Sequence, residues 1–251
     1  ELYDGINKVL MGPQKKSRVV TEADKRCTAY HEAGHAILAC LCKHCDPVHE
    51  VSIIPRGNAA GYTMTRPETD DNDVSYNKLV DNICMVLGGR VAEELVIKDV
   101  TTGASNDLER ATKIAREMVT RYGMSEELGT QVFGEAQHEV FLGRDYAQKN
   151  DYSAETAKRI DDEIERIMRE AHDRARKVLS ARGDQMRTMA EVLLERETVE
   201  GPAVDALLDG TWDQYVAEHP EEGGKPKAAP GQIDEDLVAE AAAAAAERES
   251  Q

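Results

Sequence analysis

The feature that most constrains the fold of this chain is the pentapeptide His31-Glu32-Ala33-Gly34-His35. In an α-helix, residues four positions apart share a face, so both imidazoles can reach one metal ion. Other residues independently predict a helix here: Thr21 is a good N-cap, and Asp24 three residues later completes a capping-box pattern. The helix is expected to run to about Lys43 and must stop before Asp46-Pro47. This places both histidines in mid-helix.

An H-E-x-x-H motif in a helix is typical of zinc peptidases. A catalytic zinc takes three protein ligands and leaves its fourth position to water. The metal lowers the pKa of that water toward ~7. Glu32, held beside the metal without binding it, can take the proton as the water attacks a peptide carbonyl, and can then pass it to the departing amine. By chance this spacing arises in only about one per cent of chains of this composition, so we interpret it as a metal site.

A third zinc ligand is required, and the motif does not contain one. The candidates are the carboxylates that lie downstream near predicted helices: Glu93, Glu94, Asp99, Asp107 and Glu109. The helix dipole favours the ionised form of Asp107, which lies in the first turns of its helix. Spacing alone does not choose among these residues. The remaining histidines are expected to be surface or core residues: His44, His49, His138, His172 and His219.

The five cysteines are odd in number and irregularly spaced, which predicts reduced thiols rather than a disulfide framework. Three of them (Cys40, Cys42 and Cys45) gather with His44 at the end of the first helix. A lone C-x-x-C at 42–45 is a weak motif without a matching pair, so no second metal site is expected there.

The rest of the chain predicts a mainly α-helical fold with a small antiparallel β-hairpin near the active site. Aromatic residues make up only 4% of the chain, and helix-forming residues are plentiful. Pro55-Arg56-Gly57-Asn58 supplies a turn between the two strand candidates. Gly88-Gly89 costs roughly 1 kcal/mol per glycine within its helix, so close packing is expected there. The predicted strands are 48–54 and 60–65, and the further predicted helices are 75–97, 105–122, 153–182, 184–197 (antiparallel to the one before it) and 203–208.

Charge and hydropathy limit the possible partners. The net charge of −17 repels phosphate backbones, so nucleic acid is not expected as a partner. The sequence contains no apolar run of the ~18–20 residues that a membrane helix needs. Residues 1–20 are predicted to be a connector, residues 21–210 a zinc metalloprotease domain, and residues 211–251 a disordered, acidic, alanine-rich tail.

Several sequence blocks resemble the protease domain of the FtsH family of membrane-anchored AAA+ zinc metalloproteases. They begin with the zinc helix Thr28–Ala36 and continue in the same order over about residues 5–209: Val51–Gly57, Gly88–Glu94, Thr102–Leu108 and Phe141–Asp145. The membrane helices and the G-x-x-x-x-G-K-[ST] ATPase module of that family do not occur here. We therefore expect an excised protease domain whose first residues connect to a missing ATPase.

The resemblance implies that Asp107 is the third zinc ligand, with one Zn²⁺ per chain held together with His31 and His35. It also implies a homo-hexameric ring that receives unfolded or membrane-extracted proteins at the cytoplasmic face of a membrane. ATP would be used only by the missing module, and the membrane would be reached only through missing segments. The strand around Gly61, Tyr62 and Thr63 is expected to be an edge that binds substrate as an added strand.

Two other functions are also compatible with the sequence. The chain could be a non-catalytic, zinc-containing oligomerisation module. The presence of Glu32 argues against that reading, because a purely structural site needs no base beside the metal. A free-standing zinc peptidase of another family is less favoured, since the chain has neither a further downstream histidine ligand nor a secretion signal.

Overall fold

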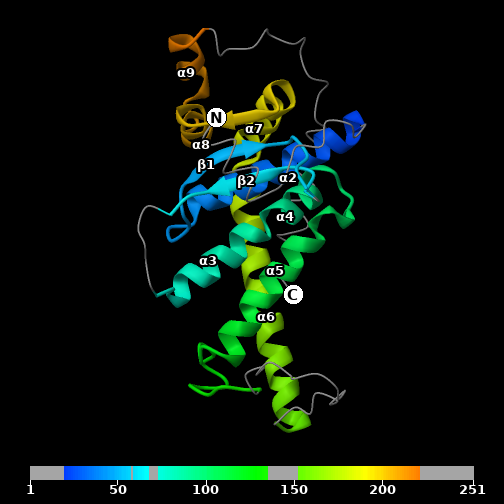
Figure 1. Cartoon of the computed structure of the whole chain (residues 1–251), viewed down its shortest axis with the longest axis vertical. Helices are drawn as coiled ribbons and strands as arrows, with labels where there is room; N and C mark the ends of the chain where they lie inside the picture. Colours follow the sequence, from blue (N-terminus) through cyan, green and yellow to red (C-terminus); the bar gives the residue numbers. More distant parts are fainter. Residues whose placement is uncertain (1–19, 58, 68–72, 135–151, 221–251) are drawn as a thin grey trace, which may run out of the picture. The chain divides into compact units, whose positions relative to one another are not determined.

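The computed structural model describes residues 20–57, 59–67, 73–134 and 152–220. This part of the chain is mainly α-helical with one three-stranded antiparallel sheet, as the sequence predicts (Figure 1). The helices are α2 Glu22–Leu41, α3 Tyr76–Val86, α4 Gly88–Val96, the 3-10 helix η1 Thr102–Ala104, α5 Ser105–Thr120, α6 Ala154–Ala181, α7 Gly183–Arg196, α8 Pro202–Asp209 and α9 Trp212–Glu218. The strands are β1 Val48–Ser52, β2 Tyr62–Thr65 and β3 Thr198–Glu200.

Helix α2 is the central element of this fold. The Thr21 side chain accepts a hydrogen bond from the backbone N–H of Asp24, so the predicted cap is confirmed. The helix ends at Leu41, two residues before the predicted end. It contacts α4 and α7 most extensively and also touches α3, β1 and β2. The middle of α2 is therefore almost fully buried, and its polar residues there need partners.

The helix predicted over 75–97 is in fact two helices, which meet at Leu87. The two glycines that follow have little helix propensity. They also allow a close backbone contact: a Cβ on Gly34 of α2 would lie 2.4 Å from the Gly88 carbonyl oxygen. A Cβ on Gly88 would lie 2.7 Å from the Gly34 carbonyl oxygen. The expected close packing at Gly88-Gly89 is confirmed, and it coincides with the break between the helices.

The sheet has the order β2-β1-β3, and both pairs are antiparallel. Val51 lies opposite Thr63 on one side and Val199 on the other. The hairpin of β1 and β2 was predicted, whereas β3 was not. Strand β3 is only three residues long and follows directly after α7, where Glu197 takes a left-handed conformation (φ 63°) that ends the helix.

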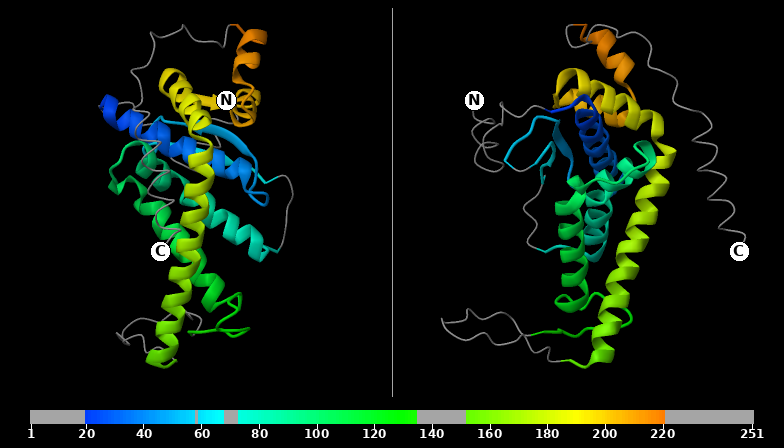
Figure 2. Two further views of the ribbon diagram at one scale, coloured as in Figure 1. Left: turned by 180° about the vertical axis from the view of Figure 1, so that it is seen from behind. Right: turned by 90° about the vertical axis from the view of Figure 1, so that its right-hand side faces the viewer.

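The predicted antiparallel pairing of the two helices on either side of Arg182 is wrong. Helix α6 runs past α3, α4 and α5, whereas α7 turns away and packs mainly against α2 (Figure 2). The sequence gives the break near Arg182 and Gly183 correctly, but it carries no signal for the direction of the chain after that break.

The predicted helix at 203–208 is confirmed as α8, and helical structure continues beyond residue 210. Helix α9 follows, and the Arg196 guanidinium lies 4.8 Å from the centre of the Trp212 ring. Most of the predicted connector (1–20) and tail (211–251), and the block Phe141–Asp145, lie outside the described residues. No helix among the described residues is both long and apolar enough to cross a bilayer.

Candidate metal centre

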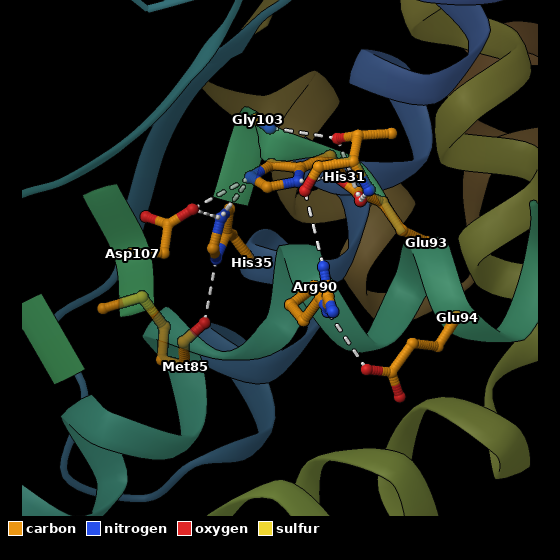
Figure 3. Close-up of polar contacts among 9 residues, drawn as sticks. His31, His35, Met85, Arg90, Glu93, Glu94, Gly103 and Asp107 are labelled. Atoms are coloured by element: carbon orange, nitrogen blue, oxygen red, sulfur yellow. Dashed lines mark hydrogen bonds and ion pairs between the residues drawn. The ribbon is translucent and has the colours of Figure 1, made fainter. Parts of the chain in front are cut away.

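The two histidines of the motif project from the same face of α2. Their Nε2 atoms lie 3.0 Å apart, as the four-residue spacing predicts. Asp107, in the first turn of α5, brings its Oδ2 to 3.1 Å from the Nε2 of His31 and 3.5 Å from that of His35 (Figure 3). Among the described residues these three form the single group whose possible ligand atoms all lie within 4.8 Å of one another.

The other nitrogen of each imidazole is held by a hydrogen bond. The Nδ1 of His31 lies 2.8 Å from Oε1 of Glu93, a carboxylate on α4 that is 1% exposed. The Nδ1 of His35 lies 2.9 Å from the Met85 carbonyl oxygen in the last turn of α3. Since both partners are acceptors, each Nδ1 carries a proton and donates it. Thr101 donates two hydrogen bonds to the second oxygen of Glu93 and so fixes that carboxylate.

These hydrogen bonds leave the two Nε2 atoms as lone-pair donors directed at the same point as the Asp107 carboxylate. Three convergent lone pairs repel one another unless a cation lies between them. In tetrahedral zinc sites with bonds of about 2.0–2.2 Å, neighbouring ligand atoms are roughly 3.3–3.6 Å apart. The distances of 3.0, 3.1 and 3.5 Å among the three atoms come close to this spacing. The chemistry and the geometry of the group therefore fit Zn²⁺.

The pKa values of His31 and Asp107 also indicate that a positive charge between these side chains is stabilised. Burial disfavours the charged form of His31, but hydrogen bonds with Asp107 and Glu93 outweigh burial and raise the pKa of His31 to about 10. Burial likewise opposes ionisation of Asp107, yet its contacts with His31 and His35 hold the Asp107 pKa below the ordinary range. When no metal is bound, a proton on His31 therefore supplies the positive charge between these side chains.

Glu32 lies beside this group but turns toward the sheet. Its carboxylate Oε2 accepts a 2.8 Å hydrogen bond from the Thr63 hydroxyl on β2, and the residue is 5% exposed. Burial raises the pKa of Glu32, and the positive charges of His35 and His31 oppose that rise. Gly61 makes room for it, since a Cβ there would lie 2.9 Å from Oε1 of Glu32. A buried carboxylate with a raised pKa is suited to taking and returning a proton.

The three residues expected to bind substrate have different surroundings. Gly61 and Thr63 border Glu32, whereas the Tyr62 hydroxyl donates a 2.5 Å hydrogen bond to the buried Glu50 carboxylate on β1. Strand β2 pairs with β1 alone in the described part of the chain, so its other edge carries no strand there. The outer edge of β2 therefore offers its backbone, rather than the Tyr62 side chain, for pairing with another strand.

The structure separates the remaining candidates from the group. Glu94 binds Arg90, His172 and Arg176, while Asp99 accepts from the backbone N–H of Val100. Glu109 is exposed, and His44 binds Asp81. His138 lies outside the described residues. The sequence reasoning treated Glu93 as a possible ligand and missed its contact with His31. The available signal was the helix face shared by Gly89 and Glu93, four residues apart.

Gly89 lies against the Nε2 edge of the His31 imidazole. A Cβ at this position would lie 2.4 Å from ring atoms of His31, so any other residue would displace the imidazole. The carbonyl of Met85 was also missed. It belongs to the last turn of α3, where carbonyl groups lose their partners within the helix, and the glycine pair was the signal for that helix end.

Comparison with known proteins gives one consistent result. The model of peptidase family M41 matches residues 18–207. A protein of Slackia heliotrinireducens called "ATP-dependent zinc metalloprotease FtsH" is 55% identical over 217 residues, which cover 86% of this chain and 28% of that protein. A protein of Caldicellulosiruptor bescii with the same name is 53% identical over 208 residues, covering 83% of this chain and 34% of its own length.

The chain thus spans about a third of the length of these curated relatives. The matched region contains all of α2 to α5, and with them every residue of the group described above. On these grounds the chain belongs to peptidase family M41.

Proposed function

We propose that this chain is the zinc endopeptidase domain of a longer, ATP-dependent protease. His31, His35 and Asp107 would hold the metal, and Glu32 would be the general base and then the general acid. The observation that carries the proposal is the convergence of three lone-pair donors on one point, with a buried carboxylate next to them. A metal that only stabilised the fold would not need that carboxylate.

Different residues have different roles in the proposed reaction. A zinc ion held by His31, His35 and Asp107 would supply Lewis acidity, which would polarise the scissile carbonyl and let water give up a proton near neutral pH. Glu32 takes that proton and returns it to the amine nitrogen as the peptide bond breaks. The Thr63 hydroxyl keeps the Glu32 carboxylate in place through its 2.8 Å hydrogen bond. Glu93 and the Met85 carbonyl keep the two imidazoles in the required tautomer.

The outer edge of β2 is the proposed binding site for substrate. An extended peptide would add to the sheet beside Gly61, Tyr62 and Thr63, and Thr63 touches Glu32. Main-chain hydrogen bonds would then supply the affinity with little preference for sequence. Such a mode suits the cleavage of unfolded or membrane-extracted proteins.

The parent protein, its assembly and its location are proposed from the relatives of this domain. The printed names of these relatives describe ATP-dependent zinc metalloproteases, which supports an ATPase partner in the parent protein. The resemblance to membrane-anchored proteases supports a homo-hexamer at the cytoplasmic face of a membrane. In that assembly, one zinc per chain would cleave substrates that the ATPase delivers.

The first experiment compares wild type with Glu32→Gln on a short, unstructured fluorogenic peptide, with bound zinc measured in both. A short peptide needs no unfolding, so the ATPase is not required. We expect one zinc per chain in both proteins and a 10²–10⁴-fold loss of turnover in the variant, the range of general acid–base catalysis. Equal turnover in the two proteins, or no zinc in either, would contradict the proposal.

Binding by strand addition is tested with backbone-methylated peptides. In a strand, every second N–H points toward a given neighbour. Methylating one set of alternate amides should therefore raise KM about tenfold per lost hydrogen bond, while methylating the other set should leave KM unchanged. A uniform response along the peptide would exclude β2 as the substrate edge.

The competing function is a zinc-containing oligomerisation module without activity. It predicts zinc and normal assembly in wild type but no turnover of any peptide. Two observations favour the peptidase instead: the raised pKa of Glu32, and the adjacent edge of β2, which has no strand partner among the described residues.

A further inference from the structure

A cluster of three cysteines lies at the end of α2, away from the candidate metal centre. Cys42 caps the helix, Cys45 lies in the turn that follows, and Cys84 lies within α3. Cys42 and Cys84 are buried, and Cys45 is partly exposed. The thiol of Cys42 interacts with the thiols of both other residues. The proposed peptidase chemistry uses none of these groups.

Cys42 is the residue in this cluster that is best placed to be a thiolate. An N–H of the Arg174 guanidinium, on α6, donates to its Sγ at 3.7 Å. Contacts with Cys45 and Cys84 and the charge of Arg174 lower the pKa of Cys42, against the opposing effects of burial and Asp81. The other charged or titratable group nearby, His44, is bound to Asp81. A thiolate is the reactive form of cysteine.

The backbone holds Cys42 and Cys45 at a suitable separation for a bond. The N–H of Cys45 donates to the Cys42 carbonyl oxygen at 3.0 Å, which closes a turn. In a β-turn the first and fourth Cα atoms are less than about 7 Å apart, and disulfides need roughly 4.4–6.8 Å. Cys84 is fixed within a helix, whereas Cys45 lies in a turn that can adjust.

We propose that Cys42 and Cys45 form a reversible disulfide when the chain meets a peroxide. The Cys42 thiolate attacks one oxygen of hydrogen peroxide, the O–O bond breaks, and hydroxide leaves and takes up the proton that Cys42 had released. Cys42 is then a sulfenic acid. The Cys45 sulfur attacks the Cys42 sulfur, the S–S bond forms, and the S–O bond breaks. The departing hydroxyl leaves as a second water with the Cys45 proton, so two thiols are oxidised and one peroxide is reduced to two waters.

The arrangement favours this two-thiol reaction over a second metal site. Among the described residues, the one group of side chains with the spacing of a metal site contains none of these cysteines. The partial exposure of Cys45 gives the oxidant a way to the cluster.

Trypsin offers a direct test, because it cleaves after Lys43 and so separates the two cysteines. Cys42 falls in the peptide 27–43, Cys45 in 44–56 and Cys84 in 79–90. The zinc-loaded chain is treated with hydrogen peroxide, its free thiols are alkylated, and the digest is analysed by mass spectrometry. We expect 27–43 to be linked to 44–56 and to be released by dithiothreitol.

Matched variants identify the thiols. Cys40→Ser, which changes an exposed thiol in the same peptide, should keep the link. Cys42→Ser and Cys45→Ser should lose it, with zinc content and circular dichroism showing that each variant is folded. Arg174→Gln should slow the link several-fold, whereas Arg176→Gln, whose partner is Glu94, should not.

Three results would overturn the proposal. They are a link from 27–43 to 79–90 in place of the expected one, no link at all, and a second bound zinc that disappears in Cys45→Ser. The first assigns the partner to Cys84, and the last makes the cluster a metal site.

Discussion

Three groups fix the imidazole of His31, and each acts on a different part of the ring. Glu93 holds Nδ1, Asp107 faces Nε2, and Gly89 lies against the ring itself. A ligand that is oriented in this way loses little freedom when a metal binds. The hydrogen-bonded carboxylate would also make the imidazole a stronger metal ligand.

Glu93→Ala should weaken zinc binding about 10–100-fold, the usual effect of losing a partner behind a histidine ligand. Glu93→Gln should weaken it less, because its amide oxygen can still accept from Nδ1. Competition with a chromogenic zinc chelator measures both affinities. Glu94→Gln is the matched control on the same helix, since Glu94 binds Arg90, His172 and Arg176, and its zinc affinity should not change. Equal zinc affinities in all variants would show that Glu93 does not support zinc binding.

At the scale of the elements, two contacts tie the helices together around α2. One is the backbone contact between Gly34 on α2 and Gly88 on α4. The other is Asp81 on α3, which accepts from the backbone and the imidazole of His44 and from Arg174 on α6. The first contact sets the distance between α2 and α4, and the second closes the far end of α2.

Gly34→Ala should lower the free energy of unfolding by about 3 kcal/mol, the upper range for overpacking. The new methyl group would lie 2.4 Å from a backbone oxygen, which cannot move aside as a side chain could. Urea denaturation measures the loss. The control is Gly183→Ala at the start of α7, where a Cβ meets nothing within 4 Å and stability should stay equal or rise by up to about 1 kcal/mol. A similar loss in both variants would mean that the crossing is not tightly packed.

Asp81 should make stability depend on pH in the acidic range. Burial raises the pKa of Asp81, but hydrogen bonds from Arg174 and His44 outweigh burial and hold it below the ordinary value of 3.8. A lowered folded-state pKa stabilises the chain above the unfolded pKa, and this stability is lost as the pH falls through the folded pKa. In the zinc-free chain, Asp81→Asn should lose about 2 kcal/mol at pH 7 and show a shallower fall in stability below about pH 4. An unchanged acid slope in the variant would contradict this.

The sequence predicts those elements that local chemistry determines. Caps and apolar periodicity give α2, α5, α6 and α8, and turn residues give the hairpin of β1 and β2. Strand β3, the direction of α7 and helix α9 depend on tertiary contacts that no local pattern records, whereas the break at Leu87 has a local signal in the two glycines that follow it. The site follows the same rule. His31, Glu32 and His35 come from spacing, whereas Asp107 comes only from the family resemblance.

At the scale of the whole molecule, zinc bound at this group would link the site to global stability. Residues 72 positions apart along the chain, His35 and Asp107, would share one ion, so binding would favour the folded state over the unfolded one. The hydrogen bonds to Nδ1 and the helix crossing do not need the metal. The metal-free chain should therefore remain folded but be less stable.

Removal of zinc by a chelator should lower the Tm by roughly 10 °C. At a thousandfold excess of zinc over its Kd, binding contributes about 4 kcal/mol, and 1 kcal/mol corresponds to about 2–4 °C for a domain of this size. Differential scanning calorimetry measures the shift. Glu32→Gln should show the same shift as wild type, and Asp107→Ala a much smaller one. A chain that unfolds completely on chelation would show that the site forms only with the metal.

The close contact of Gly89 with His31 bears on which ions the site can accept. The Nε2 edge of the ring lies against Gly89, since a Cβ at that position would be 2.4 Å from Nε2 and Cε1. The helix that carries the ring cannot move closer to α4 either, because backbone meets backbone at Gly34 and Gly88. A larger ion such as Ca²⁺, with bonds of about 2.3–2.6 Å, would need the imidazoles to move apart. We therefore expect the glycines of α4, which would bind nothing themselves, to oppose that movement and to favour small cations in the site.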